Sequence, residues 1–203
     1  AMGVAFTLTW LFGTNNEQIK NENKPSENKT EKTEQPAQAM ETKAENADIA
    51  DDGIITAPLS GKAVKLENVP DQTFAQGILG LGAAIEPTEG KVVAPGDGKV
   101  ETLFDTFHAV GLTLDNGKEL LIHVGINTVE LKGEGFKAYV SEGDRVTKGQ
   151  TLITFDMDFI KSKGYQTITP VLVGNSDEFA SVEELAEEGT EVTIGDKLIK
   201  VNA

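Results

Sequence analysis

The sequence contains no cysteine among its 203 residues. Disulfides, thiolate metal ligands and cysteine nucleophiles are therefore excluded, and any chemistry must rely on oxygen and nitrogen groups. Aromatic residues make up only 6% of the chain and hydrophobic residues 38%, which is enough for one domain core but not for two.

Basic residues are also scarce, because 18 lysines and arginines stand against 33 acids and give a net charge of -15. This balance excludes nucleic acid as a partner, since phosphate backbones are bound by patches of Lys and Arg. It favours instead a partner with a basic surface, which electrostatic attraction would steer toward the chain.

The first of three compositional parts is residues 1–13, AMGVAFTLTWLFG, which carry no charge. As a helix they would span about 20 Å, less than the roughly 30 Å of a bilayer core. They also lack the basic start and cleavage site of a signal peptide. We interpret them as the end of a transmembrane helix with Trp10 near the interface. The alternative is a short buried or disordered apolar tail.

The second part, residues 14–52, contains no Phe, Trp or Tyr, and it has 10 acids against 5 lysines. Such a segment cannot bury enough apolar surface to fold, so we predict a disordered acidic linker. In the third part, residues 53–203, short runs rich in Val, Ile, Leu and Thr alternate with turn signals that contain glycine. This pattern predicts an all-β domain, an antiparallel β-sandwich or barrel.

One or two short helices and an internal duplication are expected within this domain. SVEE at residues 181–184 is a capping box that predicts a helix to about Glu188, and residues 158–163, ended by Gly164, predict another helical turn.

EGDRVTKGQTLI (142–153) returns as EGTEVTIGDKLI (188–199), and APLSGK (57–62) returns as APGDGK (94–99). The offsets of 46 and 37 residues differ, which argues against a solenoid and favours two halves that close a sandwich.

The only histidines, His108 and His123, lie in two strand-like runs that flank Asp115-Asn116-Gly117. A two-residue hairpin loop at Asn116-Gly117 would make paired residue numbers sum to 233, and a loop at Asp115-Asn116 would make them sum to 231. In both registers the two rings project from one face of the sheet, with Cβ atoms roughly 5 to 8 Å apart. The alternative is two unrelated surface histidines.

Two neighbouring imidazoles can bind a metal, relay a proton or carry a phosphoryl group. A zinc site needs at least a third protein ligand, and no spacing in the sequence marks one. A neutral imidazole is a good nucleophile at neutral pH, and a second imidazole can stabilise phosphoryl oxygens as charge redistributes. Phosphoryl transfer is therefore the best fit.

Apolar residues accompany the histidines. Leu120 and Ile122 are expected in the core, whereas an exposed rim is expected from Leu79, Leu81, Phe104 and Phe107. Such a rim around a nucleophilic histidine would exclude water and slow the hydrolysis of a phosphohistidine. It would also give other proteins a docking patch.

The same stretch of sequence resembles a known family. GKELLIHVGINTVELKGEGF (117–136), APGDG (94–98) and FDTFH (104–108) are similar to the glucose-type enzyme IIA domains of the bacterial phosphoenolpyruvate-dependent sugar phosphotransferase system. The resemblance runs from about Ile55 to Val201. It implies an antiparallel β-sandwich that works without a cofactor or a resident metal.

The resemblance also implies roles for individual residues. The histidine matching His123 would accept a phosphoryl group from phospho-HPr and pass it to a cysteine of a IIB domain. His108 would assist, oriented by Thr106, and the main-chain carbonyl of Gly125 would hold the non-reacting ring nitrogen of His123. The phosphoryl and partner surface is expected to include Gly125, Phe104, Leu79, Leu121 and Asn127. Asn127 stands where some members have Asp, which removes a charge close to the site.

Residues 5–13 further resemble the end of the IIC membrane domain of β-glucoside, sucrose or trehalose permeases, in which a linker and IIA follow IIC. This implies HPr and the IIB and IIC domains of the same permease as partners, at the cytoplasmic face of the bacterial membrane.

Three rival functions stay open. They are a zinc hydrolase resembling LytM-like peptidases, a biotinyl or lipoyl type of carrier suggested by the Gly-Asp-x-Val-x-x-Gly-Gln turn, and a regulatory binder without catalysis.

Overall fold

The computed structural model of the chain describes residues 52–203. The apolar segment 1–13 and the linker 14–52, apart from Asp52, lie outside the described residues, so both interpretations stay predictions. None of the helices in residues 52–203 has the length and apolarity that a membrane crossing requires.

The described strands form one sheet of eight strands and two sheets of three, all with antiparallel pairing. The large sheet runs in the order β13 (Glu191–Val192), β2 (Gly61–Lys65), β3 (Leu81–Pro87), β11 (Thr169–Val173), β7 (Glu119–His123), β6 (Ala109–Leu114), β5 (Gly98–Leu103), β9 (Arg145–Val146). The small sheets are β1 (Ile54–Thr56), β14 (Lys197–Asn202), β12 (Ser181–Glu184), and β4 (Lys91–Val93), β10 (Thr151–Phe155), β8 (Phe136–Ala138). The prediction of an antiparallel all-β fold is confirmed.

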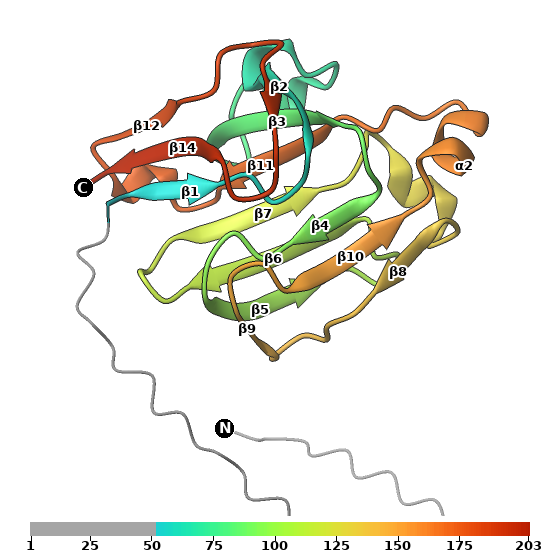
Figure 1. Cartoon of the computed structure of the whole chain (residues 1–203), viewed down its shortest axis with the longest axis horizontal. Coiled ribbons are helices and arrows are strands. Elements are labelled where there is room, and N and C mark those ends of the chain that lie inside the picture. The colour runs from blue at the N-terminus through green and yellow to red at the C-terminus, as the bar shows by residue number, and fades with distance from the viewer. Residues whose placement is uncertain (1–51) are drawn as a thin grey trace, which may run out of the picture. The chain divides into compact units, whose positions relative to one another are not determined.

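The main core fills the space between one face of the large sheet and the two small sheets (Figure 1). Strand β6 shows why its sequence fits this place, because Val110, Leu112 and Leu114 alternate inward and are buried while Gly111 and Thr113 face outward. Leu120 and Ile122 of β7 are buried in the same core, as predicted. Burial on one face fixes the register of these strands, since a slip of one residue would turn every side chain to the wrong side.

A second, smaller core lies apart from the main one. It is formed by Leu66, Val69, Phe74, Ala84, Ile126, Ile168 and Leu172. The short helices η1 (Leu66–Asn68) and α1 (Gln72–Ala75) contribute to it, and Asp71 caps α1 by accepting hydrogen bonds from the N–H groups of Thr73 and Phe74. The histidine region lies next to this second core, which therefore positions it.

One of the two predicted helices is present. Helix α2 (Met157–Ser162) begins after Asp156, whose side chain accepts a hydrogen bond from the N–H of Phe159 at 2.9 Å. The helix predicted for residues 181–188 is wrong, because residues 181–184 form strand β12. There Val182 packs against the main core and the backbone pairs with β14, so tertiary contacts outweigh the local capping signal.

The internal duplication predicted from the sequence is present in the hydrogen-bond pattern. The N–H of Gly149 donates to the carbonyl of Ala94 at 2.8 Å, and the N–H of Gly195 donates to the carbonyl of Ala57 at 3.0 Å. The strand pairs are equivalent as well, because β9 pairs with β5 in one half as β13 pairs with β2 in the other. Gly98 lies opposite Val146, and Gly61 lies opposite Val192. In each half, a glycine-rich turn and the short strand before it are thus hydrogen-bonded to an earlier segment of the chain.

The hairpin between β6 and β7 departs from both predicted registers. Ala109 lies opposite His123, so paired residue numbers sum to 232. The loop has three residues, because Leu114 and Lys118 close it with a hydrogen bond of 2.9 Å and Gly117 adopts a φ of +82°. A third loop residue in the left-handed region is the common alternative to a two-residue turn.

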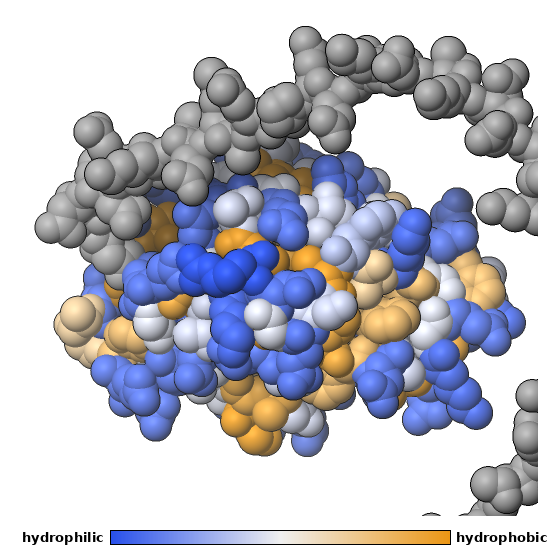
Figure 2. All heavy atoms as spheres, turned by 90° about the horizontal axis from the view of Figure 1, so that it is seen from below, coloured by the Kyte–Doolittle hydropathy of each residue, from blue (hydrophilic) through white to orange (hydrophobic). Residues whose placement is uncertain are grey.

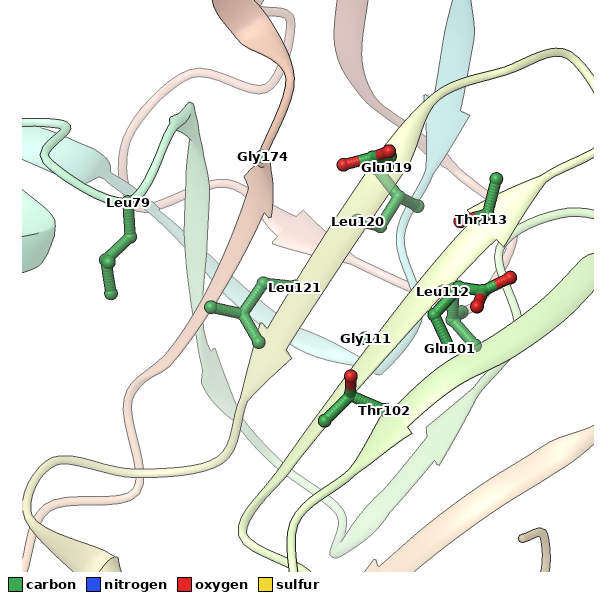
Figure 3. Close-up of a pocket in the computed structure, with 10 residues that line it drawn as sticks. All are labelled: Leu79, Glu101, Thr102, Gly111, Leu112, Thr113, Glu119, Leu120, Leu121 and Gly174. Atoms are coloured by element: carbon green, nitrogen blue, oxygen red, sulfur yellow. The ribbon is translucent and has the colours of Figure 1, made fainter. Parts of the chain in front are cut away.

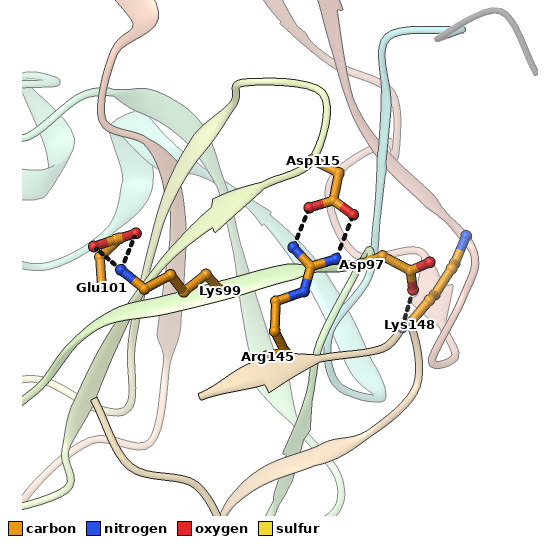
Figure 4. A network of polar contacts seen from close by, with 6 residues as sticks. All are labelled: Asp97, Lys99, Glu101, Asp115, Arg145 and Lys148. Carbon is orange, nitrogen blue, oxygen red and sulfur yellow. Dashed lines mark hydrogen bonds and ion pairs between the residues drawn. The ribbon is translucent and has the colours of Figure 1, made fainter. Parts of the chain in front are cut away.

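Polar contacts link the loop of this hairpin and the loops beside it to neighbouring segments. Arg145 of β9 makes a bidentate ion pair with Asp115 in the hairpin loop, at 2.6 and 2.8 Å (Figure 4). The backbone N–H of Lys148 donates to Asp97 at 2.7 Å. The partners are exposed, so each contact contributes little stability by itself and serves mainly to fix loop geometry.

The turn glycines give a stability test of the duplicated halves. Gly195 has a φ of +95° with open space around its α carbon, so Gly195→Ala is expected to destabilise the domain through backbone strain alone, by about 1–2 kcal/mol. Gly174→Ala is the control, because Gly174 has an ordinary φ and only ordinary contacts, and its change is expected to be neutral or slightly stabilising. Urea unfolding measures both, and equal losses in the two variants would contradict this view of the turns.

Candidate functional site

His123 is the last residue of β7, and its ring is held by the chain two residues further on. The Nδ1 atom donates to the main-chain oxygen of Gly125 at 2.8 Å. A carbonyl can only accept a hydrogen bond, so the proton of the neutral ring is on Nδ1 and the lone pair is on Nε2. Nε2 is therefore the ring atom that has a lone pair available for chemistry.

His108 lies directly before β6 and is 5% exposed. Its Nδ1 is 2.6 Å from the hydroxyl oxygen of Thr106. The preceding residue, Phe107, has a φ of +54°, which bends the chain out of strand geometry at this point. The pleat of the sheet therefore does not dictate the direction of the His108 ring, and the ring reaches His123 although the register alone would separate the two faces.

The two imidazole rings are in contact. Their centroids lie 4.8 Å apart with an interplanar angle of 82°. The predicted proximity of the histidines is thus confirmed, although it arises from the bend at Phe107 rather than from the predicted register. An aromatic ring flanks each imidazole, Phe74 at 5.0 Å from His123 and Phe104 at 5.3 Å from His108.

Burial keeps both rings uncharged near neutral pH. Burial, with a smaller contribution from the neighbouring His123, lowers the pKa of His108 to about 4. Burial also lowers the pKa of His123, while the Gly125 carbonyl and the negative charge of Asp71 oppose this effect. Both imidazoles are therefore neutral at pH 7, which leaves a lone pair available for chemistry.

An apolar rim and a groove adjoin the histidines. Leu79 and Phe104, both 42% exposed, form this rim, as predicted. Leu81 is also exposed, at 46%, but its place in the rim was predicted wrongly, because it pairs with Val173 and so projects from the face of the sheet opposite Leu121. Phe107 is only partly exposed. Figure 2 shows several hydrophobic patches on a face that is otherwise largely hydrophilic. The groove has a volume of about 590 Å³ and lies on the outer face of β5, β6 and β7, with Leu79, Leu121, Glu101 and Glu119 among its lining residues (Figure 3).

The groove and the histidine site share one face of the sheet. Leu121 precedes His123 by two residues on β7, and their partners on β6 are Gly111 and Ala109. Residues two apart on a strand project to the same side. A protein docked on the groove would therefore reach His123 as well.

The structure brings together most of the residues that the sequence singled out. His108, His123, Thr106, Gly125 and Phe104 meet within one site, Leu79 and Leu121 line the adjoining groove, and Asn127 is exposed with a left-handed φ of +58°. Sequence reasoning missed Phe74, whose ring lies against His123. Asp71 ahead of Gln72-Thr73-Phe74 was an available helix-cap signal for it.

In residues 52–203 no three histidine, aspartate or glutamate side chains gather as metal ligands would. The zinc hydrolase alternative needs a third ligand, and this part of the chain supplies no such set.

Comparisons with known proteins agree on one family. Residues 53–179 match the family described as phosphoenolpyruvate-dependent sugar phosphotransferase system, EIIA 1. The chain is 47% identical over 152 residues to a PTS system glucose-specific EIIA component of Halalkalibacterium halodurans, covering 74% of this chain and 88% of the relative. It is 50% identical over 129 residues to the component of the same name in Bacillus cereus, covering 64% and 78%.

A solved structure gives the same result. The glucose permease IIA from Mycoplasma capricolum superposes with a TM-score of 0.64 at 32% identity, covering 72% of this chain and 93% of that one. Together the antiparallel sandwich, the paired neutral imidazoles and these relatives define a histidine phosphocarrier.

Within that class the chain belongs to the EIIA 1 family of the phosphoenolpyruvate-dependent sugar phosphotransferase system. Such a component receives a phosphoryl group from HPr, carries it as a phosphohistidine and passes it to a IIB domain. The prediction of phosphotransferase function is confirmed.

The lowered pKa values predict a pH dependence. Between about pH 6.5 and 4 the unfolded chain binds protons at its histidines that the folded chain does not, so the free energy of unfolding decreases as the pH falls through this window. Imidazole NMR titration is expected to give His108 a pKa near 4. His108→Gln removes one of the two groups, so its unfolding free energy is expected to fall less over the same window. A measured pKa of His108 at or above the ordinary value would overturn this account.

Proposed function

We propose that His123 is the residue that carries the phosphoryl group, through its Nε2 atom. The observation that supports this most directly is the hydrogen bond from Nδ1 to the Gly125 carbonyl, which leaves the Nε2 lone pair free. In the forward step Nε2 forms a bond to phosphorus while the bond between phosphorus and the HPr nitrogen breaks. In the second step the phosphoryl group leaves Nε2 for the cysteine sulfur of the IIB domain.

We further propose that His108 stabilises the phosphoryl oxygens and that Thr106 orients it. When the Thr106 hydroxyl donates to Nδ1 of His108, the proton of the neutral ring is on Nε2, which can then donate to a phosphoryl oxygen. The contact between the rings, 4.8 Å between centroids, allows both to reach one phosphorus centre. His108 is neutral at pH 7 and still carries this one N–H, so it can donate to the phosphoryl group in its resting protonation state.

The partner surface in this proposal is the exposed rim with the adjoining groove. Leu79 and Leu121 supply apolar contact, and Glu101 and Glu119 supply negative charge toward a basic partner. Apolar contact at the centre with charge at the margin is the usual composition of a transient protein interface. Burial of the rim on docking would also keep water from the phosphohistidine.

Phosphoryl labelling tests the residue assignment. Incubation with phosphoenolpyruvate, enzyme I and HPr, followed by mass measurement at alkaline pH, is expected to show one acid-labile phosphate on the wild type and none on His123→Ala. His108→Gln keeps a side-chain donor but not the ring, so it is expected to accept the group and pass it on slowly. Undiminished labelling of His123→Ala would refute the nucleophile, and unchanged onward transfer in His108→Gln would refute the stabiliser.

The same assay separates docking from chemistry. Leu79→Ser is expected to raise the KM for phospho-HPr by about fivefold to tenfold with little change in kcat, as for loss of an apolar interface contact. Tyr139→Ser is the matched control, because Tyr139 is also largely exposed but lies near the edge strand β8, outside the groove. Equal effects of both substitutions would argue against this docking surface.

We propose in addition that the EIIA domain is the C-terminal part of a β-glucoside, sucrose or trehalose type of permease. The uncharged residues 1–13 and the acidic residues 14–52 support this, since they resemble the end of IIC and a linker. IIB and IIC of the same polypeptide would then be partners at the cytoplasmic face of the membrane. The upstream coding sequence decides between this proposal and a separate EIIA component. A reading frame that continues upstream into IIC would support the proposal, and an in-frame stop codon between IIC and EIIA would refute it.

A further inference from the structure

The direction of the Gly125 carbonyl controls the chemistry of His123. While this oxygen faces Nδ1 at 2.8 Å, the ring proton stays on Nδ1 and Nε2 keeps its lone pair. A carbonyl turned away would release the proton to move to Nε2, which would then be a donor rather than a nucleophile. Some feature of the chain must therefore hold this carbonyl in place.

Gly125 itself supplies no such restraint. Its φ is +75°, and glycine has more backbone freedom than any other residue. The restraint must come from the peptide groups on either side and from the side chains that touch them. Two such contacts are present, one after Gly125 and one before it.

The contact after Gly125 is a bridge to a neighbouring segment. The N–H of Ile126 donates to the main-chain oxygen of Gln166 at 3.1 Å. This N–H and the Gly125 carbonyl belong to one planar trans peptide, in which they point in opposite directions. The bridge therefore turns the carbonyl away from Gln166 and toward the His123 ring.

The contact before Gly125 comes from Thr128. Its hydroxyl donates to the main-chain oxygen of Val124 in a short hydrogen bond. The N–H of Val124 donates in turn to the main-chain oxygen of His108 at 2.7 Å. Both polar groups of Val124 are thus bonded, and the peptide that enters Gly125 is fixed relative to both histidines.

The methyl group of Thr128 adds a steric restraint. A Cβ atom placed on Gly125 would lie 2.5 Å from Cγ2 of Thr128 and 2.6 Å from the oxygen of Gln166, so the glycine backbone is packed directly against both. Thr128 is fully buried, and no solvent reaches its hydroxyl to take over the hydrogen bond. One side chain therefore restrains Gly125 by a hydrogen bond and by contact.

We propose that Thr128 is a positioning residue of the phosphoryl transfer, which fixes the Gly125 carbonyl and through it the nucleophilic tautomer of His123. The inference rests on the proposed role of His123. Thr128 does not touch the phosphoryl group, and its effect passes through one peptide to the ring.

The test compares Thr128→Val, which keeps the shape and removes the hydroxyl, with Thr128→Ser, which keeps the hydroxyl. Nitrogen-15 NMR of the unphosphorylated protein at neutral pH reports which ring nitrogen of His123 carries the proton. Thr128→Val is expected to lower the Nδ1-protonated fraction and to slow phosphoryl acceptance by roughly threefold to tenfold, as for loss of one buried hydrogen bond. Its pH profile is expected to shift downward, because the bond to the Gly125 carbonyl raises the pKa of His123. Thr128→Ser is expected to restore the tautomer.

Thr56→Val is the control for a structural effect alone. Thr56 is also buried, and its hydroxyl donates to the main-chain oxygen of Pro95 at 3.0 Å, in a different sheet. It is expected to lose stability while the tautomer, the pH profile and the acceptance rate stay unchanged. If Thr128→Val does not fold, Thr128→Ala takes its place, since the smaller side chain removes the hydroxyl without adding bulk.

A folded Thr128→Val or Thr128→Ala with the wild-type tautomer and acceptance rate would overturn the inference. Wild-type protein that takes no label at His123 would overturn the proposed function instead. The tautomer measurement needs no phosphoryl donor, so the two failures are distinguishable.

Discussion

The hydrogen bond between the His123 ring and the Gly125 carbonyl is the interaction on which the site depends. It joins a side chain to a backbone group only two residues away, so it forms only where the chain turns directly after a strand. The turn needs a residue at φ +75° with no Cβ, and the packing of Thr128 and Gln166 leaves room for glycine alone. A single local conformation thus sets both the orientation of the ring and the location of its proton.

The sandwich supplies what this local conformation cannot. Its eight-stranded sheet places the end of β7 beside the start of β6, and the second core places Phe74 against His123. The same packing removes water from both rings, which keeps them neutral. Neutral imidazoles at an apolar surface serve a phosphocarrier well, because a charged ring would have to lose a proton before it could attack phosphorus.

The duplication builds the frame around this site from two equivalent halves. Two glycine-rich turns bind two equivalent segments of the chain, and the backbone hydrogen bonds of one half recur in the other. Only one half leads into the histidine hairpin, through β5 and β6. Glu101 and Glu119 of the groove lie on that half as well, so in the proposed function chemistry and partner attraction share one surface.

Sequence reasoning predicted much of this because the signals were local. Alternation of Val, Ile and Thr gave the strands, repeated glycine turns gave the duplication, and an apolar run with one histidine indicated the core and the site together. The capping box at residues 181–184 misled because local hydrogen-bond preference is weaker than pairing with β14. The hairpin register was wrong because an Asn-Gly pair fits loops of two and of three residues.

By itself the sequence determined the fold class and the two candidate histidines, because short patterns of neighbouring residues indicate both, and its resemblance to the family implied the role of Gly125. Only the tertiary structure decided that the rings touch, because the bend at Phe107 and not the strand register brings His108 to His123. It also decided that Phe74 and Thr128 belong to the site. Their contacts with His123 and Gly125 depend on packing, which the one-dimensional pattern does not encode.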